Sequence, residues 1–320
     1  MGRVIVEEMY IFAKNLFNNL LKNSDKYGGR TCLITGEQGS GKTTMLRRLA
    51  EAYLSQGTVV IWRGRPVEQI HWIPNWKERC VFFHHANDEF KAYDVRGTVS
   101  INITDDLEIK EYTGAYDLYT KVVEDKINVV YEPTTFYFNE GIGLIDVVYK
   151  SVSKKAANKL LERPQEGNLF WFELIYVLIH RHDTRWFALL LDEADDIFPE
   201  SPQGIRWRFQ EWAKNVMRDL RKTRTNFVIC THAINDLDYR IRSKIQFWIY
   251  MKNSKVPRTS IVKPYIPSYL KRGQFIIENG LFGVGVVEPY EPPKMGDFKI
   301  VLTPKTAKKE GRENVDETEE

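Results

Sequence analysis

The sequence predicts an α/β domain with a mainly parallel sheet and helices on both of its faces. Two observations carry this prediction. A short apolar run at residues 32–34 leads into a glycine-rich turn and then into a helix-like segment at residues 45–50. A second apolar run, at residues 186–191, ends in the carboxylates Asp192 and Glu193. Short continuous apolar runs bounded by polar residues are typical of strands buried on both faces, as parallel sheets require.

The glycine-rich turn has the spacing of a phosphate-binding loop, or Walker A element, in its strand–turn–helix setting. Glycines let backbone N–H groups point inward around a polyphosphate, and the helix N-terminus adds partial positive charge. Lys42 is expected to reach the β- and γ-phosphates of ATP, and Thr43 to offer a hydroxyl to Mg²⁺. The residues predicted to bind the nucleotide are Gly36, Glu37, Gln38, Gly39, Ser40, Gly41, Lys42, Thr43 and Thr44.

The second apolar run is interpreted as a Walker B strand. Ligands of parallel sheets bind at the carboxyl ends of the strands, where Asp192 and Glu193 lie. Asp192 is expected to hold Mg²⁺ together with Thr43, and Glu193 to orient and polarise the attacking water. The alternative is a strand that ends in a solvated acidic turn, as Asp195 and Asp196 would suggest. With the phosphate loop upstream, the two elements predict a P-loop NTPase of the RecA/ASCE-like class that hydrolyses ATP.

Around these motifs the chain divides into three parts. Residues 1–29 are predicted to form an amphipathic helix, because their apolar residues recur at helical spacing. Residues 30–303 are assigned to the ATPase domain, with a β-rich insertion near 79–113 where short alternating segments suggest hairpins. Residues 304–320 are rich in Lys, Glu and Asp and are expected to be a disordered tail.

The remaining strands and helices are predicted from the spacing of apolar residues and from the Gly and Pro residues that end them. Strands are expected at residues 58–62, after the helix stop Gly57, and at 126–131, before Pro133. Two helices are expected near 142–161 and 169–181, and a third near 205–222. Further strands are expected at 227–230 and 245–250.

Composition narrows the class of protein. The chain has 320 residues, of which 43% are hydrophobic and 28% charged, which is enough for a sizeable core. Its three cysteines form no disulfide framework, no signal peptide is recognised, and the apolar runs are too short to span a membrane. A cytoplasmic enzyme is therefore expected. The net charge of +3 is too small to indicate nucleic acid by itself.

The segment that follows the Walker B strand carries a family resemblance. Residues 205–222 combine an apolar stripe with a basic one that includes Lys214, Arg218 and Arg221, and a strand ending in Thr231-His232 follows. In these features, and in residues 270–275, the chain resembles the FtsK/HerA superfamily of DNA-pumping ATPases. Within that superfamily it is most similar to the zonula occludens toxin-like and archaeal viral or plasmid members.

The resemblance implies roles for particular residues. Aligned on Thr231, the arginine finger of the family falls on Arg221 and a second basic position on Arg218. His232 stands where the family usually has glutamine, and it can still hydrogen-bond to a γ-phosphate or to water. Arg224 replaces a frequent glycine. The core also begins too early for the N-terminal barrel of HerA, which favours a compact packaging or transfer motor.

The function predicted on this basis is ATP hydrolysis coupled to translocation of double-stranded DNA, in genome packaging or DNA transfer. A homo-oligomeric ring is expected, because an arginine finger serves a neighbouring subunit, and the resemblance implies a hexamer. The alternatives are a protein-remodelling or virion- or filament-export ATPase in contact with a membrane or portal complex, and a nucleotide-dependent switch. Without the resemblance, the basic stripe would be a solvated helix face.

Overall fold

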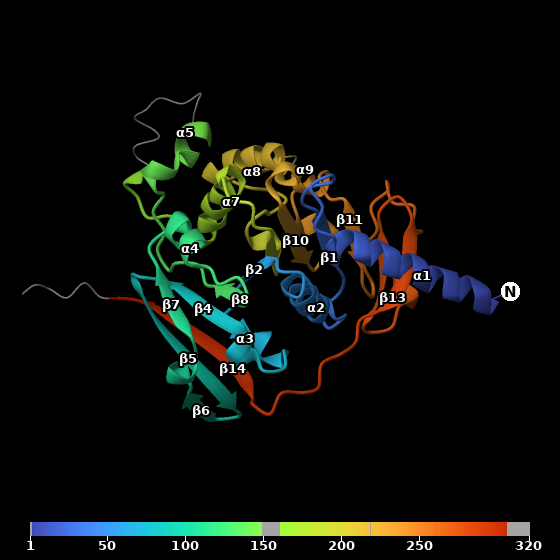
Figure 1. Ribbon diagram of the computed structural model, residues 1–320, viewed down its shortest axis with the longest axis horizontal. Helices are drawn as coiled ribbons and strands as arrows, with labels where there is room; N and C mark the ends of the chain where they lie inside the picture. Colours follow the sequence, from blue (N-terminus) through green and yellow to red (C-terminus); the bar gives the residue numbers. More distant parts are fainter. Residues whose placement is uncertain (1, 149–160, 218, 306–320) are drawn as a thin grey trace, which may run out of the picture.

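Parallel strand pairing organises the fold. The computed structural model describes residues 2–148, 161–217 and 219–305, with only the backbone described for residues 2–8, 10, 220 and 221. Over this part of the chain the main sheet has ten strands, in the order β13-β12-β11-β1-β10-β9-β2-β8-β4-β7 (Figure 1). From β11 to β7 every neighbouring pair is parallel, and β12 and β13 add an antiparallel hairpin at one edge. The α/β class predicted from the sequence is therefore confirmed.

The main-sheet strands are short, and those at its centre are fully buried, as their continuous apolar sequences indicated. Their bounds are β1 Thr31–Thr35, β2 Val59–Arg63, β4 Cys80–His85, β7 Ile109–Tyr112, β8 Ile127–Val130, β9 Phe187–Leu191, β10 Thr225–Thr231, β11 Phe247–Tyr250, β12 Gln274–Glu278 and β13 Phe282–Val286. The α-helices that lie wholly within the described residues are α1 Gly2–Leu21, α2 Lys42–Leu54, α3 Trp76–Arg79, α4 Ala115–Lys121, α5 Leu144–Val148, α7 Phe170–His180, α8 Ile205–Val216 and α9 Tyr239–Arg242.

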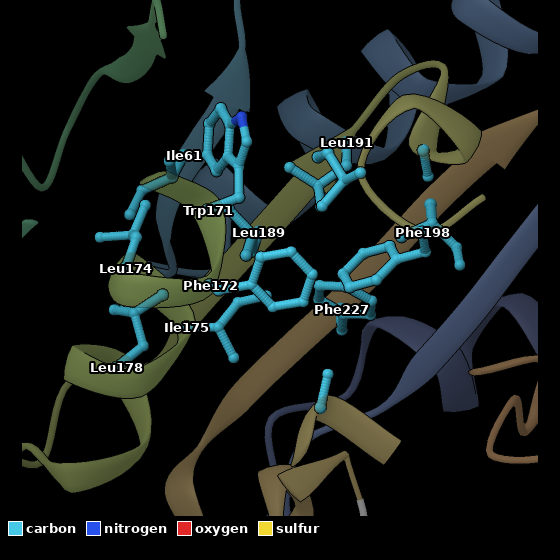
Figure 2. Packing of buried hydrophobic residues seen from close by; sticks show 14 of the residues in the cluster. Ile61, Trp171, Phe172, Leu174, Ile175, Leu178, Leu189, Leu191, Phe198 and Phe227 are labelled. Atoms are coloured by element: carbon cyan, nitrogen blue, oxygen red, sulfur yellow. The ribbon is translucent and has the colours of Figure 1, made fainter. Parts of the chain in front are cut away.

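Each face of the main sheet has its own hydrophobic core. Successive strand residues point to opposite faces, so Leu189 and Leu191 pack on one side, and Ala188 and Leu190 on the other. The first side is covered by α4, α7 and α8, and Figure 2 shows residues of α7 packed over Leu189, Phe198 and Phe227. The second side is covered by α1, α2 and a smaller sheet.

The smaller sheet corrects the predicted insertion near residues 79–113. It has the order β3-β14-β5-β6, with β3 Val67–Glu68, β5 Asp88–Arg96, β6 Val99–Asn102 and β14 Asp297–Pro304. Only β5 and β6 form the expected hairpin, whereas β4 and β7 pair in parallel with each other within the main sheet. Alternation in the sequence identifies a strand but not its partner, and β5 pairs along its length with β14, some 200 residues later.

The other expected elements fall close to their predicted positions, with local differences. The helix expected to reach residue 222 ends at Val216 and is followed by a 3₁₀ turn, Leu220–Thr223. Of the helix expected near 142–161, residues 144–148 are helical and 149–160 lie outside the described residues. The expected tail begins inside β14, and its residues 306–320 also lie outside them. Helix α4 and the β12–β13 hairpin are found in addition. Over the described residues, no helix combines the length and apolar character needed to cross a membrane.

Glu173 makes the stability of the folded protein depend on pH. Its side chain is buried in α7 and accepts a 2.7 Å hydrogen bond from the backbone N–H of Asn139. Burial raises its pKa from 4.5 to about 7, so the folded protein holds a proton between pH 4.5 and 7 that the unfolded chain has lost. The contribution of Glu173 to stability should therefore fall as pH rises through this window.

We expect Glu173→Gln to remove this contribution, because glutamine does not titrate. Between pH 5 and 8 the free energy of unfolding of the wild type should fall relative to the variant by roughly 1–3 kcal/mol. Denaturant titrations of both proteins at several pH values measure the difference. Parallel pH profiles would contradict the raised pKa.

Candidate nucleotide-binding site

The loop between β1 and α2 forms a cradle of backbone amides. Gly39 and Gly41 adopt left-handed φ values of 74° and 109°, which glycine reaches without strain. Among the described residues, the N–H groups of Gly41, Lys42 and Thr43 find no acceptor, and the first helical bond runs from the N–H of Met45 to the carbonyl of Gly41. Free amides at the start of a helix bind anions, so the loop fits a polyphosphate.

Lys42 lies at the centre of this cradle. Its ammonium donates to the carbonyls of Gly36, at 2.8 Å, and Glu37, at 3.0 Å, and lies 3.1 Å from Nδ1 of His232. Desolvation lowers the pKa of Lys42 below its ordinary 10.5, and nearby carboxylates such as Asp192 oppose this shift. His232 follows the last residue of β10, the parallel neighbour of β1, which explains how two residues 190 positions apart meet.

Thr43 and Asp192 form the pair of oxygens expected for Mg²⁺. The Thr43 hydroxyl donates a 3.0 Å hydrogen bond to Oδ2 of Asp192, which follows the last residue of β9. Mg²⁺ is usually held by one or two carboxylates together with water and substrate phosphates, so this donor set fits it. No cluster of three or more His, Cys, Asp or Glu side chains placed to hold a metal ion occurs in the described part of the chain.

Glu193 is engaged by an arginine of its own chain. Its backbone is left-handed, with φ 49° and ψ 54°, and its carboxylate forms an ion pair with Arg65. Arg65 also pairs with Asp196 at 2.7 Å. Arg63, which is nearly inaccessible to solvent, donates to the carbonyls of Asp192, at 3.0 Å, and Glu193, at 2.8 Å. The two arginines therefore fix both the backbone and the side chain of the predicted catalytic glutamate.

A cavity of about 260 Å³ lies between these groups, lined in part by Thr43, Arg65, Asp192 and Glu193. Buried Glu68 shapes its wall, because its carboxylate accepts from the N–H groups of Arg65, at 3.1 Å, and of the two residues that follow it, at 2.8 and 3.0 Å. Burial raises the pKa of Glu68 to about 7. The cavity leaves room beside the Thr43–Asp192 pair for a phosphate or a water molecule.

The structure thus brings together four of the predicted site residues, Lys42, Thr43, Asp192 and His232, with Glu193 at the rim. It does not bring Arg221 to them. The backbone at Arg221 lies in the 3₁₀ turn before β10, at the amino end of that strand, whereas the site lies at its carboxyl end. Arg218 lies outside the described residues.

Two members of the predicted nucleotide loop have other partners. The carboxylate of Glu37 pairs with Lys252 at 3.0 Å and accepts a 2.7 Å hydrogen bond from the side-chain amide of Asn253. The Thr44 hydroxyl accepts from Arg47 at 3.2 Å. Their side chains are therefore held by the protein, which leaves their backbones to shape the loop.

Sequence reasoning missed Arg63, Arg65 and Glu68. A signal for them exists, because Arg63 directly follows the strand predicted at residues 58–62, and side chains at carboxyl ends of parallel strands gather at one edge. The sequence does not show, however, that β2 is the neighbour of β9, and that pairing is what brings the arginines to Glu193.

A comparison with protein families finds an NTPase match in the first part of the chain. A family model described as Novel STAND NTPase 5 matches residues 8–90, which contain the phosphate loop but make up less than half of the chain. No curated protein matches the sequence. The parallel sheet, the phosphate loop and the family match are consistent with one another in pointing to the P-loop NTPase fold.

Several solved structures are similar to the chain at low identity. The genome packaging NTPase B204 of Sulfolobus turreted icosahedral virus 2, in complex with ATP-gammaS, is 13% identical, with 83% of this chain and 98% of that chain covered and a TM-score of 0.42. The bacterial conjugative coupling protein TrwBdeltaN70 is 9% identical, with 87% of each chain covered and a TM-score of 0.47. The pCW3 conjugation coupling protein TcpA is 12% identical, with 82% of this chain and 61% of that chain covered and a TM-score of 0.40.

We expect Lys42→Ala to weaken Mg-ATP binding by roughly 10- to 100-fold, because a charge-assisted hydrogen bond contributes about 1.5–3 kcal/mol. Titration with a fluorescent ATP analogue measures the affinity, and far-UV circular dichroism checks the fold. Arg48→Ala is the matched control, since this cation lies on the same helix but stacks on Tyr290, with its guanidinium 3.8 Å from the ring centroid. Equal affinities of wild type and Lys42→Ala would refute the assignment of the loop.

Proposed function

We propose that this chain hydrolyses ATP and couples the hydrolysis to movement of double-stranded DNA, acting in a ring of identical subunits. The observation that supports hydrolysis best is the meeting of Lys42, Thr43, Asp192 and His232 at one edge of the sheet. DNA as the partner is supported by the resemblance of residues 205–232 and 270–275 to DNA-pumping ATPases. The proposal extends to genome packaging or DNA transfer as the setting.

The residues of the site can divide the work of hydrolysis. Lys42 would exchange its loop carbonyls for the β- and γ-phosphates, which offer a stronger, charged partner. Thr43 and Asp192 would hold Mg²⁺, whose charge stabilises the transition state when bound. His232, next to Lys42, would contact the γ-phosphate. Glu193 would orient a water for attack on the γ-phosphorus, with cleavage of its bond to the bridging oxygen.

Glu193 would be freer to take this role once Arg65 releases it. In the structure one oxygen of its carboxylate is paired with Arg65, which holds the side chain beside that arginine. We infer that this arrangement represents a resting state of low turnover. The same ion pair is the observation that favours the second candidate, a nucleotide-dependent switch in which the release of Glu193 seldom occurs.

Action of Arg221 on a neighbouring subunit is supported by the topology. Strand β10 has seven residues, and at about 3.3 Å per residue it spans roughly 20 Å. The backbone at Arg221 therefore lies about that far from the phosphate loop of its own chain. An arginine finger at this position would have to serve the nucleotide of another subunit, as a ring allows. We propose a hexamer on the basis of the family resemblance.

We expect Glu193→Gln to bind ATP almost normally and to lose about 10²- to 10⁴-fold in turnover, since glutamine keeps the shape but cannot take a proton from water. Asp192→Asn should differ by weakening Mg²⁺-dependent binding as well. Steady-state phosphate release and nucleotide titration separate the two effects. Normal turnover of Glu193→Gln would transfer the role to Asp195 or Asp196.

We expect Arg221→Ala to bind ATP but to lose about a thousandfold in turnover, as arginine-finger removal does. Lys222→Ala is the matched control, because this neighbouring cation is exposed and pairs locally with Asp219 at 3.1 Å. Mixing Arg221→Ala with Lys42→Ala should restore part of the activity, because some interfaces then combine an intact loop with an intact finger. The mixture is assayed at concentrations where wild-type activity per chain no longer rises. An inactive mixture there would argue against action between subunits.

A further inference from the structure

We propose that the segment between β11 and β12, residues 251–273, is the surface that binds the DNA phosphate backbone, and that it is joined directly to the nucleotide loop. We call this segment the basic loop. The inference rests on the proposed function and deepens it by assigning the site of contact. Loops of more than about 15 residues without regular strands or helices are uncommon and usually functional. Over its 23 residues this one has only a short 3₁₀ turn, Ile266–Tyr269.

The charge of the basic loop is of one sign. It contains six cations and no Asp or Glu, although the whole chain has a net charge of only +3. Lys252 pairs with Glu37, whereas the other five are exposed and make no ion pair within 4 Å with any described carboxylate. These five are Lys255, Arg258, Lys263, Lys271 and Arg272. Unpaired cations concentrated on one segment attract a polyanion and release its counterions.

A cavity and two tyrosines extend this surface. The cavity, of about 580 Å³, is lined by side-chain donors such as Asn235, Lys255 and Arg258, and by Arg242, which pairs with Glu200 at 2.9 Å. Tyr265 and Tyr269 are 60% and 78% exposed, and their rings meet edge to face at 6.3 Å. Lys, Arg, Asn and Tyr are residue types that contact DNA phosphates, so the composition fits nucleic acid.

Although it is exposed, the basic loop is firmly anchored. The buried carboxylate of Glu278, on β12, accepts hydrogen bonds from the hydroxyls of Tyr250, at 2.8 Å, and Ser260, at 2.5 Å, and from the N–H of Ile261, at 2.9 Å. The Ser254 hydroxyl donates to the carbonyl of Thr35, the last residue of β1, at 2.5 Å. A surface held in place in this way loses less conformational freedom when it binds a ligand.

Both ends of the basic loop are hydrogen-bonded to the nucleotide loop. At the start, the Lys252 carbonyl accepts from the N–H of Glu37 at 3.1 Å, and the Asn253 side chain donates to the Glu37 carboxylate at 2.7 Å. At the end, the N–H of Gly273 donates to the carbonyl of Ser40 at 3.0 Å. A shift of the nucleotide loop on ATP binding or release would therefore move the basic loop with it.

The test compares two triple variants that remove equal charge. Lys255→Ala, Arg258→Ala and Lys263→Ala are combined in the loop variant, and Lys22→Ala, Lys294→Ala and Lys299→Ala, all exposed lysines elsewhere, in the control. Affinity for a labelled DNA duplex is measured by fluorescence anisotropy between 50 and 200 mM salt, and circular dichroism checks the fold. The loop variant should bind roughly 10- to 100-fold more weakly, and its slope of log affinity against log salt should be smaller by up to about 3. The control should bind like the wild type.

The outcomes separate this inference from the proposed function. A wild type that binds no duplex would overturn both. If the wild type and the loop variant bind duplex equally well, the basic loop is not the DNA-binding surface. The proposed motor function would be unaffected by that result. Tighter binding of a single strand, or of an acidic polypeptide such as polyglutamate, would overturn duplex DNA as the partner of this surface.

A second variant tests the connection to the nucleotide. Asn253→Gly removes the hydrogen bond to Glu37 and retains the left-handed backbone of residue 253, where φ is 55°. Duplex affinity should stay within about threefold of the wild type, because the Asn253 side chain is held by Glu37 and the five exposed cations are kept. Stimulation of ATP hydrolysis by duplex should fall several-fold. Unchanged stimulation in a variant that binds duplex normally would overturn the connection.

Discussion

The parallel hydrogen bonding of β11, β1, β10, β9 and β2 is the constraint on which this site depends. Because these five neighbouring strands run in one direction, their carboxyl ends lie at the same edge of the sheet. From that edge come Lys42 and Thr43 after β1, His232 after β10, Asp192 after β9 and Arg65 after β2. The basic loop leaves β11 at the same edge. A polar site and a charged surface are therefore built from segments spread over more than 200 residues.

Opposite charges are balanced closely around the site. Arg63 and Arg65 neutralise Glu193 and Asp196, and the pKa of Asp192 is raised by desolvation while Lys42 and its hydrogen bond from Thr43 oppose the rise. A triphosphate with its metal ion would bring several new charges into this balance. These new charges would act on the ion pair between Arg65 and Glu193, because that pair joins the loop after β2 to the predicted catalytic carboxylate. The predicted catalytic carboxylate of Glu193 and the arginine that holds it are thus in direct contact.

The opposite edge of the sheet, at the amino ends of these strands, carries the basic turn that precedes β10. There Arg181, whose side chain is buried, donates to the carbonyls of Thr223 and Arg224, next to the turn that carries Arg221. Arg224 pairs with Asp25 at 2.7 Å, which ties the same turn to the segment after α1. The turn is therefore held in place from both sides. One edge of the sheet holds the candidate nucleotide site and the other a fixed basic turn, an arrangement that is compatible with the proposed ring.

The sequence by itself determined the local parts of this protein. The phosphate loop and the Walker B strand could be predicted because the residues of each motif are consecutive. Their buried strands could be predicted because they are continuous apolar runs. Only the tertiary structure decided which strands are neighbours: β2 beside β9, which delivers Arg65 to Glu193, and β14 beside β5, which corrected the predicted insertion. The physical reason is that strand pairing is made by backbone groups that every residue carries. A strand's sequence therefore records that it is buried, and not which strand lies next to it.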